Sequence, residues 1–263
     1  MLTISNYVRA QSLEEAYTLC QKKNNVVLGG MLWLKMQHRN VGTAIDLCDL
    51  GLDTVEETET AYRIGAMVTL RVLEQHEALH ALTQGAMADA VKDIVGVQFR
   101  NVATIGGSIY GRFGFSDVLT LFLALDASVE LYHAGVVPLR DFAAMPYQRD
   151  ILVRVIVPKA KKTVVYRAQR NISTDFPVLT CALSVQDKRM LCAIGARPMP
   201  AGVLEQQLPC ALSDMTEQEA EELAEQIAGQ FTMGSNLRGS ADYRRAICKV
   251  LVRRALMAAK EAD

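Results

Sequence analysis

The spacing of apolar residues in the first 100 positions predicts short strands alternating with helices. A capping-box pattern, S-L-E-E, at residues 12–15 begins a helix whose apolar side chains share one face as far as Cys20. Helical spacing returns over residues 69–95, where Gly85 interrupts it. Short apolar runs typical of strands lie at residues 26–28, 44–47 and 62–66.

Beyond residue 100 the pattern shifts toward strands. A glycine-rich turn is expected over residues 103–114, and an apolar helix over residues 118–126. Helices over residues 216–230 and from about residue 240 close the chain. Strands are expected at residues 128–132, 151–157, 163–167, 178–185 and 190–196. Short polar turns join the last three strands and predict an antiparallel meander. The fold class is therefore α+β, with a boundary near residues 160–165.

The balance of charge excludes several classes of partner. Lys and Arg total 28 and Asp and Glu total 29, which gives a net charge of -1. Nucleic acids and anionic lipids both attract basic surfaces, so neither is an expected partner. No run approaches the roughly 20 apolar residues of a membrane helix. The first ten residues carry no signal-peptide pattern, so we expect a cytoplasmic protein without membrane insertion.

The cysteines are too widely spaced for an iron–sulfur motif. Of the six, the closest pair is Cys181 and Cys192, and the chain contains no C-x-x-C. In a reducing compartment we expect them to be mostly buried apolar side chains.

One motif suggests a metal site. Residues 76–80, H-E-A-L-H, match the H-E-x-x-H pattern, in which two histidines one helical turn apart bind zinc. Between His80 and Asp117 the only acidic candidates for a third ligand are Asp89 and Asp93. We therefore favour a helix end whose histidines face water, and a zinc hydrolase remains the alternative.

Other common motifs are missing from the sequence. There is no G-x-G-x-x-G dinucleotide motif and no P-loop. Residues 107–111, G-S-I-Y-G, miss the nucleophile-elbow pattern G-x-S-x-G by one position. A serine hydrolase is therefore not indicated.

Two glycine pairs follow apolar runs, Gly29-Gly30 and Gly106-Gly107. Without a Cβ atom, such pairs let the backbone approach a ligand closely, and successive N–H groups there can surround phosphate oxygens. The simpler interpretation is two tight turns, and the spacing alone leaves both open.

The residues around the second pair resemble a known family. Residues 100–108, R-N-V-A-T-I-G-G-S, are followed by Ser116-Asp117 and then by L-F-L-A-L-D-A at residues 121–127. This order resembles the FAD-binding subunit of the molybdopterin dehydrogenases, the xanthine dehydrogenase and carbon monoxide dehydrogenase family. Residues 27–32, V-L-G-G-M-L, are similar to the first flavin loop of that family, and residues 238–256 are similar to its C-terminal domain.

The resemblance implies a fold of the FAD-binding PCMH type. Two small subdomains, residues 1–55 and 56–162, would hold FAD between them. A C-terminal α+β domain, residues 163–263, would contain a three-stranded antiparallel sheet and helices.

The resemblance also implies which residues contact FAD. The first loop would surround the pyrophosphate with backbone amides, and the hydroxyl of Thr104 would donate to a phosphate. Asp117 would accept a hydrogen bond from a sugar-type hydroxyl, while Ile94 and Leu152 would lie against the flavin ring. The full set of implied positions is Val27, Leu28, Gly29, Gly30, Met31, Leu32, Trp33, Leu34, Ile94, Thr104, Ile105, Gly106, Gly107, Ser108, Asp117 and Leu152.

Several positions depart from the family pattern. Met31-Leu32 replace a Thr-Asp pair, and Ser108 replaces an asparagine. The basic residue expected near the flavin falls on Ala168, beside Arg167. Backbone binding of phosphate tolerates such changes, whereas tuning of the flavin depends on side chains.

By resemblance, the chain is an electron-transfer subunit. A molybdopterin-binding large subunit would hydroxylate the substrate, and a small iron–sulfur subunit would pass electrons to FAD. The flavin would reduce an acceptor such as NAD+ or a quinone. No catalytic acid, base or metal ligand is predicted in this chain. A diverged flavin-binding or assembly subunit, and a flavoprotein serving another kind of partner, are the alternatives.

Three further features have ordinary structural interpretations. Ser240 and Asp242 are expected to cap the last helix. Trp33 either stacks near adenine or belongs to the core. The arginines at positions 244, 245, 253 and 254 are expected on a solvated face or at a subunit contact.

Overall fold

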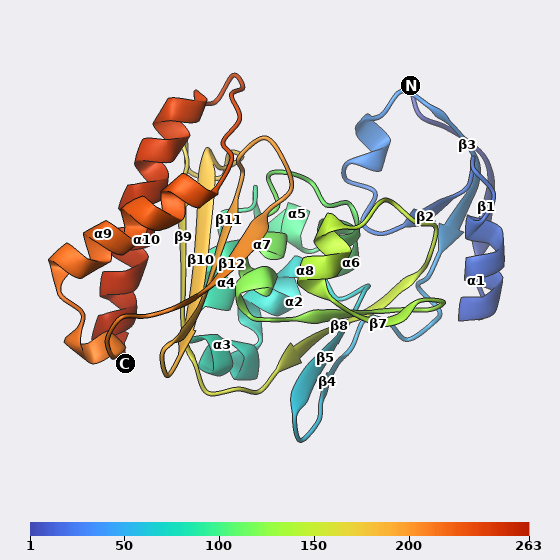
Figure 1. Ribbon diagram of the computed structural model, residues 1–263. Coiled ribbons are helices and arrows are strands. Elements are labelled where there is room, and N and C mark those ends of the chain that lie inside the picture. The colour runs from blue at the N-terminus through green and yellow to red at the C-terminus, as the bar shows by residue number, and fades with distance from the viewer. Residues whose placement is uncertain (263) are drawn as a thin grey trace.

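The computed structural model describes residues 1–262 and contains three β-sheets that follow one another along the chain (Figure 1). Asp263, the last residue of the predicted C-terminal domain, lies outside the described residues. The first sheet is parallel, with strand order β1-β3-β2. Ser12 begins the adjoining helix as predicted, because its hydroxyl accepts a hydrogen bond from the N–H of Glu15. The elements are β1 (Thr3–Arg9), α1 (Leu13–Cys20), β2 (Val26–Leu28), the 3-10 turn η1 (Leu34–Met36) and β3 (Asn40–Asp46).

The second unit combines a five-stranded antiparallel sheet, of order β4-β5-β8-β6-β7, with short helices. The long helical pattern of residues 69–95 becomes three helices. Thr69 and His76 each cap a new helix start, and Gln84 and Gly85 adopt left-handed backbone, with φ of 51° and 87°. The strands are β4 (Val55–Glu57), β5 (Ala61–Gly65), β6 (Ser128–Leu131), β7 (Gly135–Pro138) and β8 (Leu152–Pro158). The helices are α2 (Leu70–Gln75), α3 (Glu77–Thr83), α4 (Ala86–Val91), α5 (Val97–Arg100), α6 (Ile105–Tyr110), α7 (Asp117–Ala124) and α8 (Leu139–Ala144).

The third unit contains the predicted meander, extended by one strand. Its antiparallel sheet has four strands in the order β12-β11-β10-β9, where three were expected. The final helices are as predicted, and a complete capping box at Thr216 begins the first. The elements are β9 (Thr163–Gln169), β10 (Leu179–Gln186), β11 (Arg189–Gly195), β12 (Gly202–Gln207), η2 (Leu212–Asp214), α9 (Glu217–Gln230) and α10 (Ala241–Ala262).

The strands that the hydrophobic pattern missed all lie at sheet edges. β1, β4, β7 and β12 each pair with a single neighbour, and most of their side chains are exposed or half-buried. An edge strand buries little apolar surface, so its sequence lacks the run of apolar residues that identifies a central strand. The polar character of V-L-E-Q-Q in β12 illustrates this.

Helix α7 lies at the centre of the molecule and joins the second and third units. Every one of its residues is buried. It contacts β10, β11 and β12 on one side and α4, α6 and α8 on another. Helix α10 covers the opposite face of the third sheet and packs against α9, as Figure 1 shows at the orange and red end of the chain. This sheet is therefore buried on both faces, which explains the seven consecutive buried residues of β10.

The prediction of a solvated arginine face was wrong for Arg244. This side chain is completely buried, because it follows the stripe of α10 that also carries Cys248, Leu251 and Ala255. Among residues 1–262 its guanidinium has no carboxylate partner and is satisfied by neutral acceptors. These are the carbonyl oxygens of Val178, Ala196, Gly234 and Gly239 and the side-chain oxygen of Asn236.

Two smaller findings concern the helices. Ser240 caps α10 as predicted, by accepting a hydrogen bond from the N–H of Tyr243. None of the helices described in residues 1–262 is long and apolar enough to cross a membrane.

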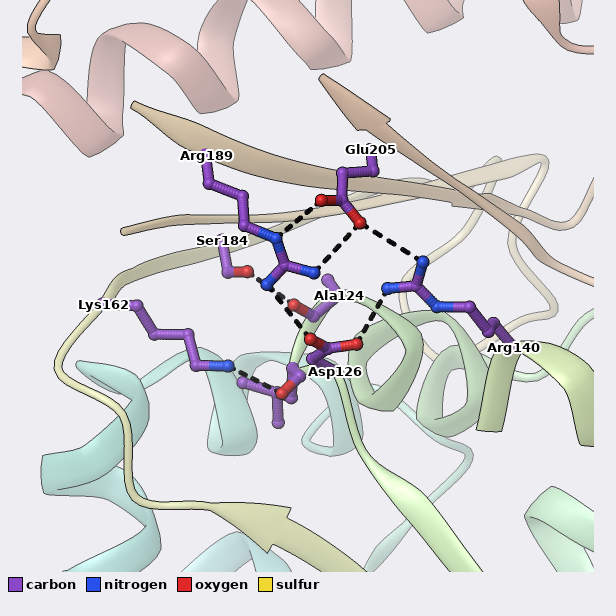
Figure 2. Close-up of polar contacts among 8 residues, drawn as sticks. Ala124, Asp126, Arg140, Lys162, Ser184, Arg189 and Glu205 are labelled. Carbon is purple, nitrogen blue, oxygen red and sulfur yellow. Dashed lines mark hydrogen bonds and ion pairs between the residues drawn. The ribbon is translucent and has the colours of Figure 1, made fainter. Parts of the chain in front are cut away.

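A ring of alternating charges ties the end of α7 to the third sheet (Figure 2). Asp126 accepts from Arg140 at 2.8 Å and from Arg189 at 3.1 Å, and Glu205 on β12 pairs with the same two arginines. Beside the ring, Lys162 donates to the carbonyl oxygen of Leu125. The hydrogen bonds from Arg189, followed by those from Arg140, lower the pKa of Glu205 to about 2.

This ring predicts a specific loss of stability in acid. The folded-state pKa of Glu205 lies below its ordinary value of 4.5, so its ionised form stabilises the fold above that value. The contribution is lost as the pH falls from about 5 toward 2. We expect the stability difference between wild type and E205Q to shrink across this range in urea titrations at low salt. E221Q, which alters an exposed glutamate of α9, serves as the control. A difference that stays constant with pH would contradict the assignment.

Candidate functional site

A cavity of about 650 Å³ lies where the three units meet. Its volume falls within the roughly 300–1,000 Å³ of small-molecule and cofactor pockets. Its wall is formed in part by the first loop (residues 27–34), by the starts of α6 and α7, and by the loop between β9 and β10. Every predicted contact position lines the cavity except Ile105, which is buried in the apolar core of the second unit.

The first glycine pair is required by a close contact between two loops. A Cβ atom at Gly30 would lie 2.0 Å from the carbonyl oxygen of Val102, and one at Gly29 would lie 2.7 Å from the hydroxyl oxygen of Thr104. Any larger residue would therefore push the two loops apart. The sequence indicated that another group lies close to this backbone. At the positions of the missing Cβ atoms, that group is another loop of the protein.

The backbone of this first loop offers free hydrogen-bond donors. Within residues 1–262, the N–H groups of positions 29–33 form no hydrogen bond with another backbone or side-chain group. Met31 adopts a left-handed conformation, with φ of 57°, which is uncommon for a residue other than glycine. Alternation of right- and left-handed residues is the geometry that makes a concave nest for anions. Backbone donors of this kind do not depend on the Thr-Asp side chains that the chain lacks.

The second glycine pair behaves differently from the prediction. The expected turn is helix α6, because the hydroxyl of Thr104 caps it by accepting from the N–H of Gly107 at 3.1 Å. The N–H groups of Ile105, Gly106 and Ser108 donate to carbonyl groups of the chain. What this segment can offer a ligand is therefore the hydroxyl hydrogen of Thr104, which the capping interaction leaves free.

A buried carboxylate stands at the start of α7. Oδ1 of Asp117 accepts hydrogen bonds from the hydroxyl of Tyr166 and from Nη2 of Arg170, the latter at 2.6 Å. Oδ2 accepts none from another residue in the described part of the chain. Burial raises the pKa of Asp117 to about 6, because lost hydration outweighs the opposing effects of Arg170 and Tyr166. A cavity-lining carboxylate with one unused oxygen fits the predicted hydroxyl partner.

Aromatic rings form one wall of the cavity, and Trp33 is at their centre. Its ring centroid lies between 5.3 and 6.2 Å from four phenylalanine rings. These are Phe99, Phe113, Phe115 and Phe176, all of which line the cavity. Such a wall suits the flat rings of a dinucleotide. Sequence reasoning missed the phenylalanines because they come from three segments, namely α5, the loop before α7 and the loop between β9 and β10, and share no local motif.

The apolar positions predicted beside the flavin ring line the cavity, whereas the predicted basic position does not. Ile94 and Leu152 both line it. Ala168, the expected basic position, packs against the apolar core instead. The basic residue that β9 and its following loop bring to the cavity is Arg170, which no motif in the sequence singled out.

The first and second units are fastened together at the rim of the cavity. The guanidinium of Arg149 donates to the carbonyl oxygens of Cys20, Lys22 and Lys23 at the end of α1. In return, the side chain of Gln21 donates to the carbonyl oxygen of Arg149. This reciprocal contact fixes the first loop relative to the rest of the cavity wall.

The zinc interpretation lacks the necessary geometry. His76 sits between α2 and α3, and its Nδ1 accepts from the N–H of Leu79 as a helix cap. His80 contacts the carbonyl oxygen of Leu73 through Nε2. Both histidines are half-buried, so the expectation that they face water was wrong as well. In the described residues, 1–262, no three His, Cys, Asp or Glu side chains gather in a way that could hold a metal.

Together these groups fit FAD. The free amides of the first loop and the hydroxyl of Thr104 suit a pyrophosphate, the aromatic wall suits planar rings, and Oδ2 of Asp117 suits a hydroxyl. No basic pocket is needed for the phosphates, in agreement with the near-neutral charge of the chain.

Comparisons with known proteins agree with this fit. Residues 3–160 match the FAD binding domain in molybdopterin dehydrogenase, and residues 165–259 match the CO dehydrogenase flavoprotein C-terminal domain. An uncharacterized protein, YgfM of Escherichia coli K12, is 29% identical over 95% of this chain and 94% of its own. The glyceraldehyde dehydrogenase medium chain of Sulfolobus acidocaldarius is 25% identical over 95% of this chain and 96% of its own.

A solved structure shares the fold. It is a carbon monoxide dehydrogenase from Hydrogenophaga pseudoflava that lacks the Mo-pyranopterin moiety of its molybdenum cofactor. It superposes with a TM-score of 0.86 at 24% identity, over 97% of this chain and 96% of that one.

The contact between the two loops predicts that G30A impairs FAD binding. The added methyl group overlaps the carbonyl of Val102, so the first loop shifts and its amides lose their arrangement. We expect loss of bound FAD and a lower thermal midpoint. G229A is the matched control, because that glycine lies in α9 with open space around its Cβ position. If G30A retains FAD as the wild type does, the loop contact is not needed.

The hydroxyl of Thr104 predicts a second, separable effect. T104V removes a helix cap and an unused hydroxyl donor, whereas T216V removes a cap at the start of α9 and a hydroxyl donor that is already bonded to Glu219. Both variants should lose about 1 kcal/mol of stability. Only T104V should weaken FAD binding, by roughly tenfold or more, because a hydrogen bond to a charged oxygen is lost. Titration of apoprotein with FAD measures this, and equal affinities in the two variants would refute it.

Proposed function

The chain belongs to the family of FAD-binding domains in molybdopterin dehydrogenases, and from this premise we propose that it is the electron-transferring medium subunit of a molybdenum hydroxylase complex. The observation that carries the proposal is a single cavity that combines free loop amides, an open carboxylate oxygen and an aromatic wall. When bound there, FAD would supply the redox chemistry.

The residues of the chain would bind and orient the cofactor. The amides of positions 29–33 and the hydroxyl of Thr104 would hold the pyrophosphate, and Asp117 would hold a hydroxyl of the cofactor chain. The apolar side chains of Ile94 and Leu152, together with the aromatic wall around Trp33, would exclude water from the rings.

The metal centres would reside on partner chains. The cysteines of this protein are scattered through its units. In the third unit, Cys181, Cys192 and Cys248 are buried among apolar residues and Cys210 is partly buried. A molybdopterin-binding large subunit and a small iron–sulfur subunit are therefore the proposed partners. The relative from Sulfolobus acidocaldarius, described as a medium chain, supports a role within a multi-subunit enzyme.

The proposed electron acceptor is a small oxidant such as a quinone. The sequence contains no G-x-G-x-x-G motif, so the proposal includes no separate NAD+ site in this chain.

The test is purification of the tagged chain from its native host. We expect a visible flavin spectrum, one FAD released per chain, and co-purifying subunits that contain iron and molybdenum. For the chain alone, FAD at 100 times its dissociation constant should add about 2.7 kcal/mol to the free energy of unfolding. Colourless protein that FAD does not stabilise would overturn the proposal.

The same complex distinguishes the assembly-subunit alternative. Supplying a reducing substrate to the molybdenum subunit should bleach the flavin band. A complex that contains FAD but never bleaches would favour a structural role for this chain. G229A, purified in the same way, controls for effects of mutation and handling.

A further inference from the structure

Arg170 is a buried cation at the cavity with most of its hydrogen-bond donors unused. It begins the loop between β9 and β10, it lines the cavity, and its side chain is only 8% exposed. Nη2 donates to Asp117 and Nη1 donates to the carbonyl oxygen of Asp175. A guanidinium carries five N–H donors, so three remain. One of them, on Nε, is buried and has no partner within residues 1–262.

The side chain is held where it stands. Its ion pair with Asp117 joins two groups that are both almost fully buried, and Tyr166 fixes the same carboxylate oxygen from β9. The guanidinium is therefore held in place at the cavity wall. Buried donors without acceptors destabilise a protein, and those of a cation do so most.

The other partly buried arginine in the cavity wall is different. The Nη atoms of Arg149 already donate to three carbonyl oxygens at the end of α1. Its role in joining two units is accounted for by the chain itself. Arg170 instead keeps a buried Nε donor that has no acceptor within residues 1–262.

Resting on the proposed FAD-binding function, we propose that Arg170 is a cofactor-binding residue that donates a hydrogen bond to an electron-rich oxygen of bound FAD. Asp117 positions it by holding one edge of the guanidinium. Two kinds of oxygen on FAD have this chemistry, a phosphate oxygen and a carbonyl oxygen of the isoalloxazine ring. A phosphate oxygen would offset the positive charge of Arg170, and either kind of oxygen would accept a hydrogen bond from one of its unused N–H groups.

The test must separate this contact from the damage caused by an unpaired charge. R170M alone would leave Asp117 buried without its partner, which is destabilising in itself. We therefore compare D117N with D117N/R170M, because position 117 is neutral in both. The expected result is at least a roughly tenfold higher FAD dissociation constant in the double variant, the usual effect of losing a charged hydrogen bond.

Two measurements identify the oxygen. If Arg170 contacts a phosphate, the double variant also binds ADP more weakly than D117N does. If it contacts the ring, ADP affinity is unchanged and the midpoint potential of the bound flavin becomes more negative, because a nearby positive charge is lost. Either pattern supports the proposal.

Equal FAD affinity of D117N and D117N/R170M would overturn it. If the double variant does not fold, R170K in the otherwise unchanged chain replaces it, with a smaller expected loss of affinity, and unaltered binding is again the refuting result. R189M controls for loss of an ion pair away from the cavity. Wild type and R189M that bind no FAD would instead refute the proposed function itself.

Discussion

The complete burial of helix α7 is the constraint on which the other parts of the structure depend. Its residues are apolar on every side, so protein must surround it, and the second and third units do so from different directions. Apart from Asp117, the helix carries one polar side chain, Thr120. The Thr120 hydroxyl forms hydrogen bonds with the carbonyl oxygen of Ser116 and with the hydroxyl of Thr180. The two units therefore share one core.

The two ends of this helix serve different purposes. Its first residue, Asp117, stands in the wall of the cavity and orders Tyr166 and Arg170 around it. Just beyond its last residue, Asp126 enters the ring of charges with Arg140, Arg189 and Glu205 (Figure 2). Because a packed helix moves as a rigid body, the position of the cavity and the docking of the third sheet are fixed together.

The cavity illustrates how a nearly neutral protein can hold a charged cofactor. The first loop presents backbone N–H groups, and its shape depends on two glycines that pack against Val102 and Thr104. Replacement of the family's Thr-Asp pair by Met31-Leu32 leaves those amides in place. Arg170 contributes a positive charge to the cavity wall. The buried carboxylate of Asp117 pairs with it and offsets part of the free energy needed to bury that charge.

Much of the fold was determined by local sequence. Central strands and the helix caps at Ser12 and Thr216 were predictable, because each depends on neighbours within a few residues. The family pattern, which extends over nearly the whole chain, gave the architecture and the cofactor. The edge strands could not be found in this way, because they bury too little apolar surface to leave a pattern.

Only the tertiary structure decided the remaining features. Arg244 is buried, Ile105 belongs to the core, and Arg170 with the phenylalanine wall belongs to the cavity, although nothing in their local sequence says so. The physical reason is that burial and the supply of hydrogen-bond partners come from segments that are distant in the chain. The sequence determined which residues could bind FAD through their own backbone, and packing around α7 determined which side chains joined them.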